Sequence, residues 1–98
     1  MRVVETKRAQ KDLEKLRSRM ATLLNYKLWK ERVEQIGPDS LRKIGGYHDE
    51  QIKDGHGLRS SRLGKGYRVF YRLLSDEQIE VCEVAAINNH DYKKATRS

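Results

Sequence analysis

The sequence predicts an α+β fold, in which an N-terminal strand and an αα-hairpin precede a three-stranded antiparallel sheet that packs on the helices. Two observations predict it. Between residues 9 and 36, apolar residues recur every three or four positions, as they do on one face of a helix. Between residues 58 and 87, apolar and polar residues alternate in three runs separated by turn residues, as in strands that bury one face.

The composition indicates one compact domain, residues 1–98, with an anionic partner. Charged residues make up 36% of the 98 positions and hydrophobic residues 37%, so the core is small and much of the surface is ionised. With 21 Lys and Arg against 14 Asp and Glu, the net charge is +7. This charge favours a polyanionic partner, with nucleic acid first and an acidic protein second.

We expect the protein to reside in the cytoplasm and to make no contact with membranes. No apolar run approaches the roughly 20 residues of a spanning helix, and the start, MRVVETKRAQ, has no signal-peptide core. The single cysteine, Cys82, cannot form an internal disulfide, which fits a reducing compartment. We expect it to be a small buried side chain inside a strand.

The N-terminal elements follow from periodicity and stop signals. The β-branched run Arg2–Glu5 predicts a strand at a sheet edge or beside the C-terminal hairpin. Two helices follow, the second from about Thr22 to Ile36 with Gly37-Pro38 as its stop signal. The buried stripe of the first is expected at Ala9, Leu13, Leu16 and Met20, and that of the second at Leu28, Trp29, Val33 and Ile36.

The stretch from residue 38 to residue 57 contains four glycines, two histidines and a proline but only scattered apolar residues, which predicts a long loop. We expect one helical turn around Ser40–Ile44 and then an exposed segment. That segment is expected to bring Glu50 and His56 near the entry to the sheet.

The turns set the register of the sheet. Gly64-Lys65-Gly66 and Ser75-Asp76-Glu77 predict two tight hairpins, with Leu63 opposite Tyr67 and Leu74 opposite Gln78. The strands are then Leu58–Leu63, Tyr67–Leu74 and Gln78–Ile87. The predicted core face carries Leu63, Tyr67, Val69, Tyr71, Leu73, Ile79, Val81, Ala85 and Ile87. The opposite face carries Ser60, Arg62, Arg68, Phe70, Arg72, Glu80, Cys82 and Val84.

Arginines dominate this polar face. The register puts Arg72 opposite Glu80, which predicts a structural ion pair. Arg62 lies opposite Arg68, and two guanidinium groups side by side repel each other unless an anion bridges them. The same alternation, continued past the last strand, puts His90 on this face. The sequence therefore predicts a phosphate site with a titratable group at its edge.

These residue types fit RNA cleavage without a metal, which needs a base, an acid and a cation that holds the phosphate. Arg68 and Arg62 suit the phosphate because a guanidinium offers two parallel donors to its oxygens. His90 suits the acid, since an imidazole titrates near neutrality. Tyr92 could stack on a base or orient the phosphate. Glu50 is a candidate base.

No cofactor is expected, and His48, His56 and His90 lack the spacing of zinc ligands, so no metal is expected either. The glycines of Gly64-Lys65-Gly66 precede a strand rather than a helix, so they form a hairpin turn and not a phosphate-binding loop.

The element order, the strand Tyr67-Arg68-Val69-Phe70-Tyr71 and the tail NNHDYKK resemble the RelE/ParE superfamily of bacterial toxins. The resemblance implies a toxin of a type II toxin-antitoxin system. In the ribonuclease members the arginine of this strand contacts the scissile phosphate, so the resemblance implies this role for Arg68. A basic residue one strand earlier assists in those members, which implies the same role for Arg62, with Arg59 as a further candidate. It further implies cleavage of mRNA in the ribosomal A site, arrest of translation, and a small acidic antitoxin as partner, with the toxin itself monomeric.

The resemblance leaves the base open. His90 stands where YoeB-like and YafQ-like members have the acid, although Asp91 separates it from Tyr92. Glu50 matches the loop glutamate of YoeB-like members, and His56 the loop histidine of YafQ-like members, so the two compete for one role. Two other readings remain: a ParE-like toxin that binds DNA gyrase and cuts nothing, and a catalytically silent module that binds RNA or an antitoxin.

Overall fold

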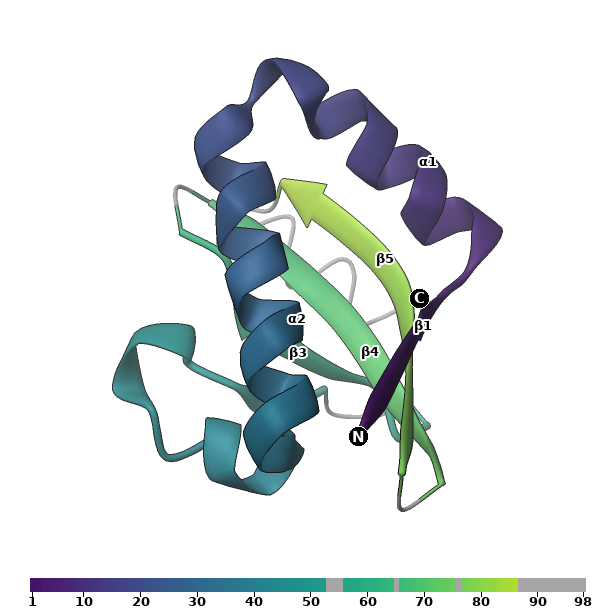
Figure 1. Cartoon of the computed structure of the whole chain (residues 1–98), viewed down its shortest axis with the longest axis vertical. Helices are drawn as coiled ribbons and strands as arrows, with labels where there is room; N and C mark the ends of the chain where they lie inside the picture. Colours follow the sequence, from purple (N-terminus) through teal and green to yellow (C-terminus); the bar gives the residue numbers. More distant parts are fainter. Residues whose placement is uncertain (53–55, 65, 76, 87–98) are drawn as a thin grey trace.

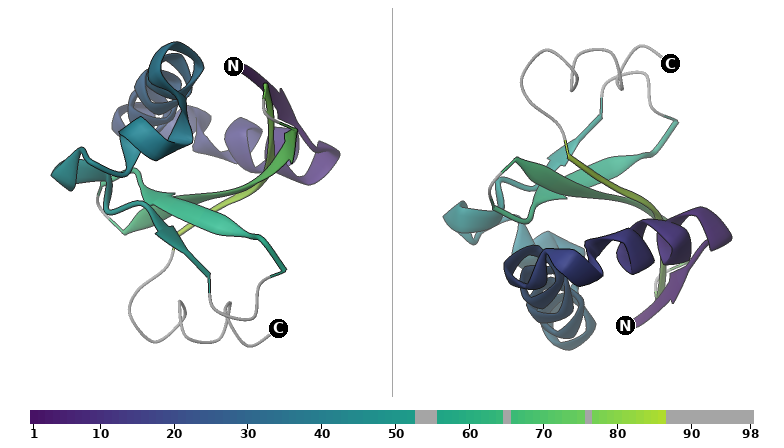
Figure 2. Two further views of the ribbon diagram at one scale, coloured as in Figure 1. Left: turned by 90° about the horizontal axis from the view of Figure 1, so that it is seen from below. Right: turned by 90° about the horizontal axis from the view of Figure 1, so that it is seen from above.

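The computed structural model describes residues 1–52, 56–64, 66–75 and 77–86. They form a five-stranded mixed sheet with two α-helices over one face (Figures 1 and 2). The strands are β1 (Arg2–Glu5), β2 (Glu50–Gln51), β3 (Arg59–Arg62), β4 (Tyr67–Ser75) and β5 (Gln78–Ala86), and the helices are α1 (Lys7–Lys15) and α2 (Met20–Leu41). The order across the sheet is β1-β5-β4-β3-β2, with β1 parallel to β5 and the other pairs antiparallel.

The predicted α+β class is right, but the predicted three-stranded antiparallel sheet is wrong. The N-terminal strand joins the same sheet and pairs with β5, in the C-terminal hairpin, which is one of the two positions expected for it. The short strand β2, in the stretch predicted to be a loop, adds the opposite edge. Sequence periodicity missed β2 because two residues are too few to show alternation.

The helices begin and end at clear local signals. Thr6 caps α1, because its Oγ1 accepts a hydrogen bond from the Ala9 amide at 3.0 Å. A 3₁₀ turn, Leu16–Ser18, then redirects the chain into α2. Gly37 has a φ of 81° and breaks α2 where the sequence predicts its stop, although a further helical turn continues to Leu41.

The buried stripe of α2 differs from the prediction. Trp29 and Val33 are buried as expected, whereas Leu28 and Ile36 are 51% and 43% exposed. Met20, predicted to be buried, is 59% exposed because α1 ends before it. The Trp29 ring packs on Tyr71 of β4, with ring centroids 5.3 Å apart, so α2 covers the centre of the sheet.

A bulge in β5 shifts the sheet register. Arg72 pairs with Glu80 and Tyr71 with Val81 as predicted, but Phe70 pairs with Glu83, so Cys82 is an extra residue. Beyond Cys82 the alternation of faces is inverted. Val84, predicted on the polar face, is therefore buried in the core, while Ala85, predicted in the core, pairs with Arg68.

The turn between β4 and β5 also differs from the prediction, since Gln78 pairs with Ser75 rather than with Leu74. Leu73, predicted in the core, is 46% exposed. It lies near the end of the hairpin, where Met1 and Pro38 line a shallow cleft with it. No helix in the described part of the chain is apolar over a length that could cross a membrane.

Candidate functional site

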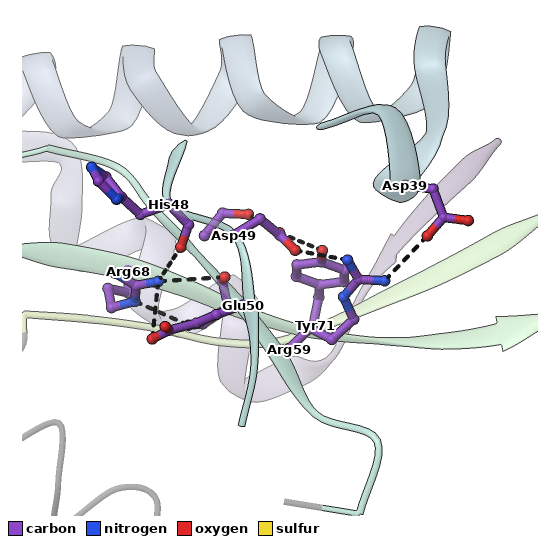
Figure 3. A network of polar contacts seen from close by, with 9 residues as sticks. Asp39, His48, Asp49, Glu50, Arg59, Arg68 and Tyr71 are labelled. Atoms are coloured by element: carbon purple, nitrogen blue, oxygen red, sulfur yellow. Dashed lines mark hydrogen bonds and ion pairs between the residues drawn. The ribbon is translucent and has the colours of Figure 1, made fainter. Parts of the chain in front are cut away.

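Arg68 of β4 is the centre of a polar cluster on the sheet face that the helices leave uncovered (Figure 3). Its Nε donates to Ser60 Oγ at 2.9 Å, and its Nη2 donates to the His48 carbonyl oxygen at 2.8 Å. The same Nη2 lies 3.7 Å from Glu50 Oε1. Two hydrogen bonds, one to a side chain of β3 and one to the backbone just before β2, thus hold the guanidinium in one orientation.

Glu50 reaches this cluster from β2. It pairs with Ser60 of β3, and directly paired residues project from the same face of a sheet. The Glu50 side chain is 50% exposed and that of Arg68 is 15% exposed. The structure therefore brings together two of the predicted site residues, a carboxylate open to solvent and a well-oriented cation.

Arg62 pairs with Arg68 across β3 and β4, so the predicted register is confirmed. The two side chains nevertheless have different neighbours. Arg62 lines a cleft of about 360 Å³ together with Leu28 and Arg32 of α2, whereas Arg68 bonds to Ser60 and His48. Among the described residues, the neighbours of the two arginines differ.

A second polar cluster lies on the helix-covered face, around Asp49. Its carboxylate accepts hydrogen bonds from Arg59 Nη2 at 2.8 Å and from the hydroxyl groups of Ser61 and Tyr71 (Figure 3). Burial, the largest single effect, lowers the pKa of Arg59, but the hydrogen bond with Asp49 and the neighbouring charges together outweigh it, so the pKa is raised. Burial and then the bond to Asp49 raise the pKa of Tyr71. Arg59 is thus a buried structural group, not a candidate phosphate contact.

The structure separates the two candidate bases. His56 lies in an exposed turn before β3, with a φ of 53°, whereas Glu50 lies 3.7 Å from Arg68. His90 and Tyr92 lie outside the described residues. The alternation that put His90 on the Arg68 face no longer supports that placement, because the bulge at Cys82 inverts it.

The environment of Arg72 also departs from the prediction. Its register opposite Glu80 is confirmed, yet within the described residues the two side chains form no ion pair. Both side chains instead influence the pKa of the Cys82 thiol. Cys82 is half-buried at the bulge, whereas full burial was predicted. Burial raises the pKa of the Cys82 thiol, and the nearby Arg72 opposes this rise in part.

Sequence reasoning missed Asp49, Ser60 and the carbonyl of His48. The signal for Asp49 was its place next to Glu50, since neighbours in a strand project to opposite faces, but without β2 there was no strand to apply this rule to. A backbone carbonyl leaves no signal in side-chain patterns. In the described part of the chain, no three His, Cys, Asp or Glu side chains gather as metal ligands would.

Comparisons with known proteins agree on the fold. YafQ from Escherichia coli BL21(DE3) has a TM-score of 0.72 at 15% identity, covering 88% of this chain and 93% of that one. A YoeB/ParE toxin from Agrobacterium tumefaciens has a TM-score of 0.70 at 21% identity, covering 90% and 100%. The YoeB-YefM complex from Staphylococcus aureus has a TM-score of 0.68 at 17% identity, covering 86% and 93%. The curated protein sequences contain no match.

These structures are toxins of the RelE/ParE superfamily, and this chain shares their fold. The sequence profile described as "ParE toxin of type II toxin-antitoxin system, parDE" matches residues 3–91. The chain belongs to this ParE toxin family, and it is a toxin of a type II toxin-antitoxin system.

Proposed function

We propose that this toxin is an endoribonuclease that cleaves mRNA, on the ribosome, and so inhibits translation. The observation that carries the proposal is the oriented guanidinium of Arg68 with the carboxylate of Glu50 3.7 Å away. A fixed cation beside a carboxylate supplies two of the three groups that metal-free RNA cleavage needs. The net charge of +7 supports a partner as rich in phosphate as the ribosome.

In the proposed mechanism, Arg68 binds the scissile phosphate and Glu50 takes the proton of the 2′-hydroxyl group. The ion pair between them is no obstacle to binding. At 3.7 Å and with Glu50 half exposed, it is worth at most about 1 kcal/mol, so a phosphate can replace the carboxylate at Arg68. The displaced carboxylate then lies beside the bound nucleotide, where a base is needed.

The acid is proposed to be His90, as the resemblance implies, with Tyr92 orienting the phosphate and Arg62 contacting the flanking backbone. Glu50 is preferred to His56 as the base, because the Glu50 carboxylate lies 3.7 Å from the Arg68 guanidinium.

The test is cell-free translation with purified protein, followed by mapping of mRNA 5′ ends. Arg68→Lys keeps the charge but loses the paired donors and is expected to slow cleavage about 100-fold. Arg72→Lys, the same change four residues along the same strand, is the matched control and should cut at the wild-type rate. Glu50→Gln should slow cleavage by about 100-fold or more, because it removes the base. If the wild type stops translation without cutting mRNA, the nuclease proposal fails.

The second candidate is a toxin that binds DNA gyrase and cuts nothing, and the match to the ParE family profile favours it. A histidine near the end of the last strand is unusual in ParE-like members, which is why the nuclease is preferred. Supercoiling assays with purified gyrase separate the two. Inhibited supercoiling, with intact mRNA in the translation assay, would establish the gyrase-directed activity instead.

The proposed partner is an acidic antitoxin, with the toxin alone monomeric. Structures of YafQ with DinJ and of YoeB with YefM have been solved, which supports a partner of this kind. The outer face of α2 offers a surface for it, since Met20, Leu24 and Leu28 are exposed at four-residue spacing. Among the described residues that line the cleft beside Leu28 are two arginines and no carboxylate, which suits an acidic amphipathic helix.

Leu24→Asp tests this surface without touching the Arg68 cluster. It should abolish co-purification with an antitoxin encoded next to the toxin and leave mRNA cleavage intact. Unchanged binding would place the antitoxin elsewhere.

A further inference from the structure

The side chain of Asp49 is fully buried, with 0% of its surface exposed. A buried carboxylate is costly unless it is paired with a charge and hydrogen-bonded. Here three donors meet it: the guanidinium of Arg59 and the hydroxyl group of Ser61, both from β3, and the hydroxyl group of Tyr71 from β4. Asp49 therefore ties the chain just before β2 to two strands of the sheet.

The residues on either side of Asp49 belong to the Arg68 cluster. Glu50 follows it and projects to the opposite face of the sheet, 3.7 Å from Arg68. His48 precedes it and accepts a hydrogen bond from Arg68 through its carbonyl oxygen. Figure 3 shows the two clusters on the two sides of this short stretch of backbone.

Backbone pairing alone gives this stretch little support. Strand β2 has two residues, Glu50 and Gln51, and it is the edge of the sheet. Both of its side chains are exposed, so neither anchors the strand by burial. The stretch is held instead from its two ends, by the buried carboxylate of Asp49 and by the buried side chain of Ile52, whose amide donates to the Leu58 carbonyl oxygen at 2.8 Å.

We propose that Asp49 is a positioning residue, whose buried carboxylate holds β2 in the register that brings the Glu50 carboxylate and the His48 carbonyl to Arg68. The consequence for activity rests on the function proposed above, but the consequence for the geometry at Arg68 does not. The test therefore needs one measurement that is independent of cleavage.

That measurement is the Nε–Hε signal of Arg68 in a ¹H–¹⁵N NMR spectrum of the whole protein, assigned by its loss in Arg68→Lys. Asp49→Asn keeps the shape of the side chain but turns one acceptor into a donor that faces the hydroxyl groups. The Arg68 signal is expected to shift or broaden in this variant, while the spectrum of the core stays dispersed. An unchanged Arg68 signal in Asp49→Asn would overturn the proposal.

Two controls separate positioning from loss of stability. Asp39 lies 3.8 Å from the same Arg59, but its side chain is 90% exposed, so Asp39→Asn changes the charge near Arg59 without disturbing the buried bonds. Ile79 is buried in β5, separated from β2 by β3 and β4, so Ile79→Val lowers stability far from the site. The Arg68 signal should stay in place in both variants.

Cleavage then tests the link with Glu50. Asp49→Asn is expected to slow mRNA cleavage about 100-fold, as small misplacements of catalytic groups do. Combining it with Glu50→Gln should slow cleavage by less than the product of the two single losses, because Asp49 acts in part through Glu50. A multiplied loss in the double variant would overturn the proposal. If the wild type cuts no mRNA, the proposed function fails, and the Arg68 signal still decides whether Asp49 positions this edge.

Discussion

The backbone of His48 adopts the left-handed conformation, with a φ of 44°, directly before Asp49. Side chains with a Cβ rarely adopt this conformation, and histidine tolerates it better than branched residues do. The turn aims the carbonyl oxygen of His48 at Arg68, and this hydrogen bond does not involve the imidazole ring. The contribution of His48 to the site is thus a matter of backbone geometry.

At this scale, we predict that His48→Gly keeps the stability and the activity of the wild type, since glycine adopts the left-handed conformation freely. His48→Val should be less stable than His48→Gly by about 1 kcal/mol, because a branched side chain is strained there. Urea unfolding of both variants measures the difference. Equal stability would mean that the turn at residue 48 is not left-handed in solution.

Helix α1 supplies a hydrogen-bond acceptor at the bulge in β5. The bulge at Cys82 interrupts the hydrogen bonds between β4 and β5, and the Val84 amide donates to Asp12 Oδ2 of α1 at 3.0 Å instead. Asp12 is almost fully buried and lies 3.5 Å from the Arg8 guanidinium, which also bonds to Glu83 at 2.9 Å. Polar contacts therefore join a helix and a strand at this bulge.

We predict that Asp12→Ala destabilises the protein by about 1 to 3 kcal/mol, because it leaves a buried amide without an acceptor. Asp12→Asn is the matched control, since its amide oxygen can still accept the hydrogen bond of the Val84 amide. It should lower the free energy of unfolding by less than Asp12→Ala does. Thermal and urea unfolding measure both. If the two variants lose the same stability, the charge of Asp12, and not its role as acceptor, matters at the bulge.

Across the whole molecule, two buried phenols connect separate elements of the core. The Tyr26 hydroxyl of α2 donates to Glu5 of β1, and the Tyr71 hydroxyl of β4 donates to Asp49. Burial first, and then the neighbouring carboxylate, raises the pKa of each tyrosine well above its ordinary value. Both groups are therefore linked to the stability of the fold at alkaline pH.

The direction follows from proton binding. Unfolded tyrosines lose their protons near pH 10, whereas these two keep them in the folded state. The stability that they contribute is present below about pH 10 and is lost as the pH rises further, by up to about 1.4 kcal/mol per pH unit for each tyrosine. We predict that Tyr71→Phe makes the fall in the free energy of unfolding at alkaline pH less steep. Urea unfolding between pH 9 and 11, in about half-unit steps, measures it, and an identical slope in the variant would contradict the assignment.

The sequence was sufficient to predict the class of the fold, the edge strand β1, the hairpins and the pairing of Arg62 with Arg68, because turns and alternation are local signals. It was not sufficient for the bulge, since the extra residue Cys82 fits the alternating pattern as well as its neighbours do. Polar clusters across strands depend on tertiary packing, so the partners of Arg68 and the burial of Arg59 could not be predicted.

The parallel pairing of β1 with β5 places Arg2 beside Gln78. Synthesis proceeds from the N-terminus, so β1 leaves the ribosome long before its partner strand exists, and contacts that distant in sequence form slowly. The sheet that carries Arg68 and Glu50 is completed only after β5 has emerged. Strand β1 therefore has no sheet partner until residues 78–81 have been synthesised.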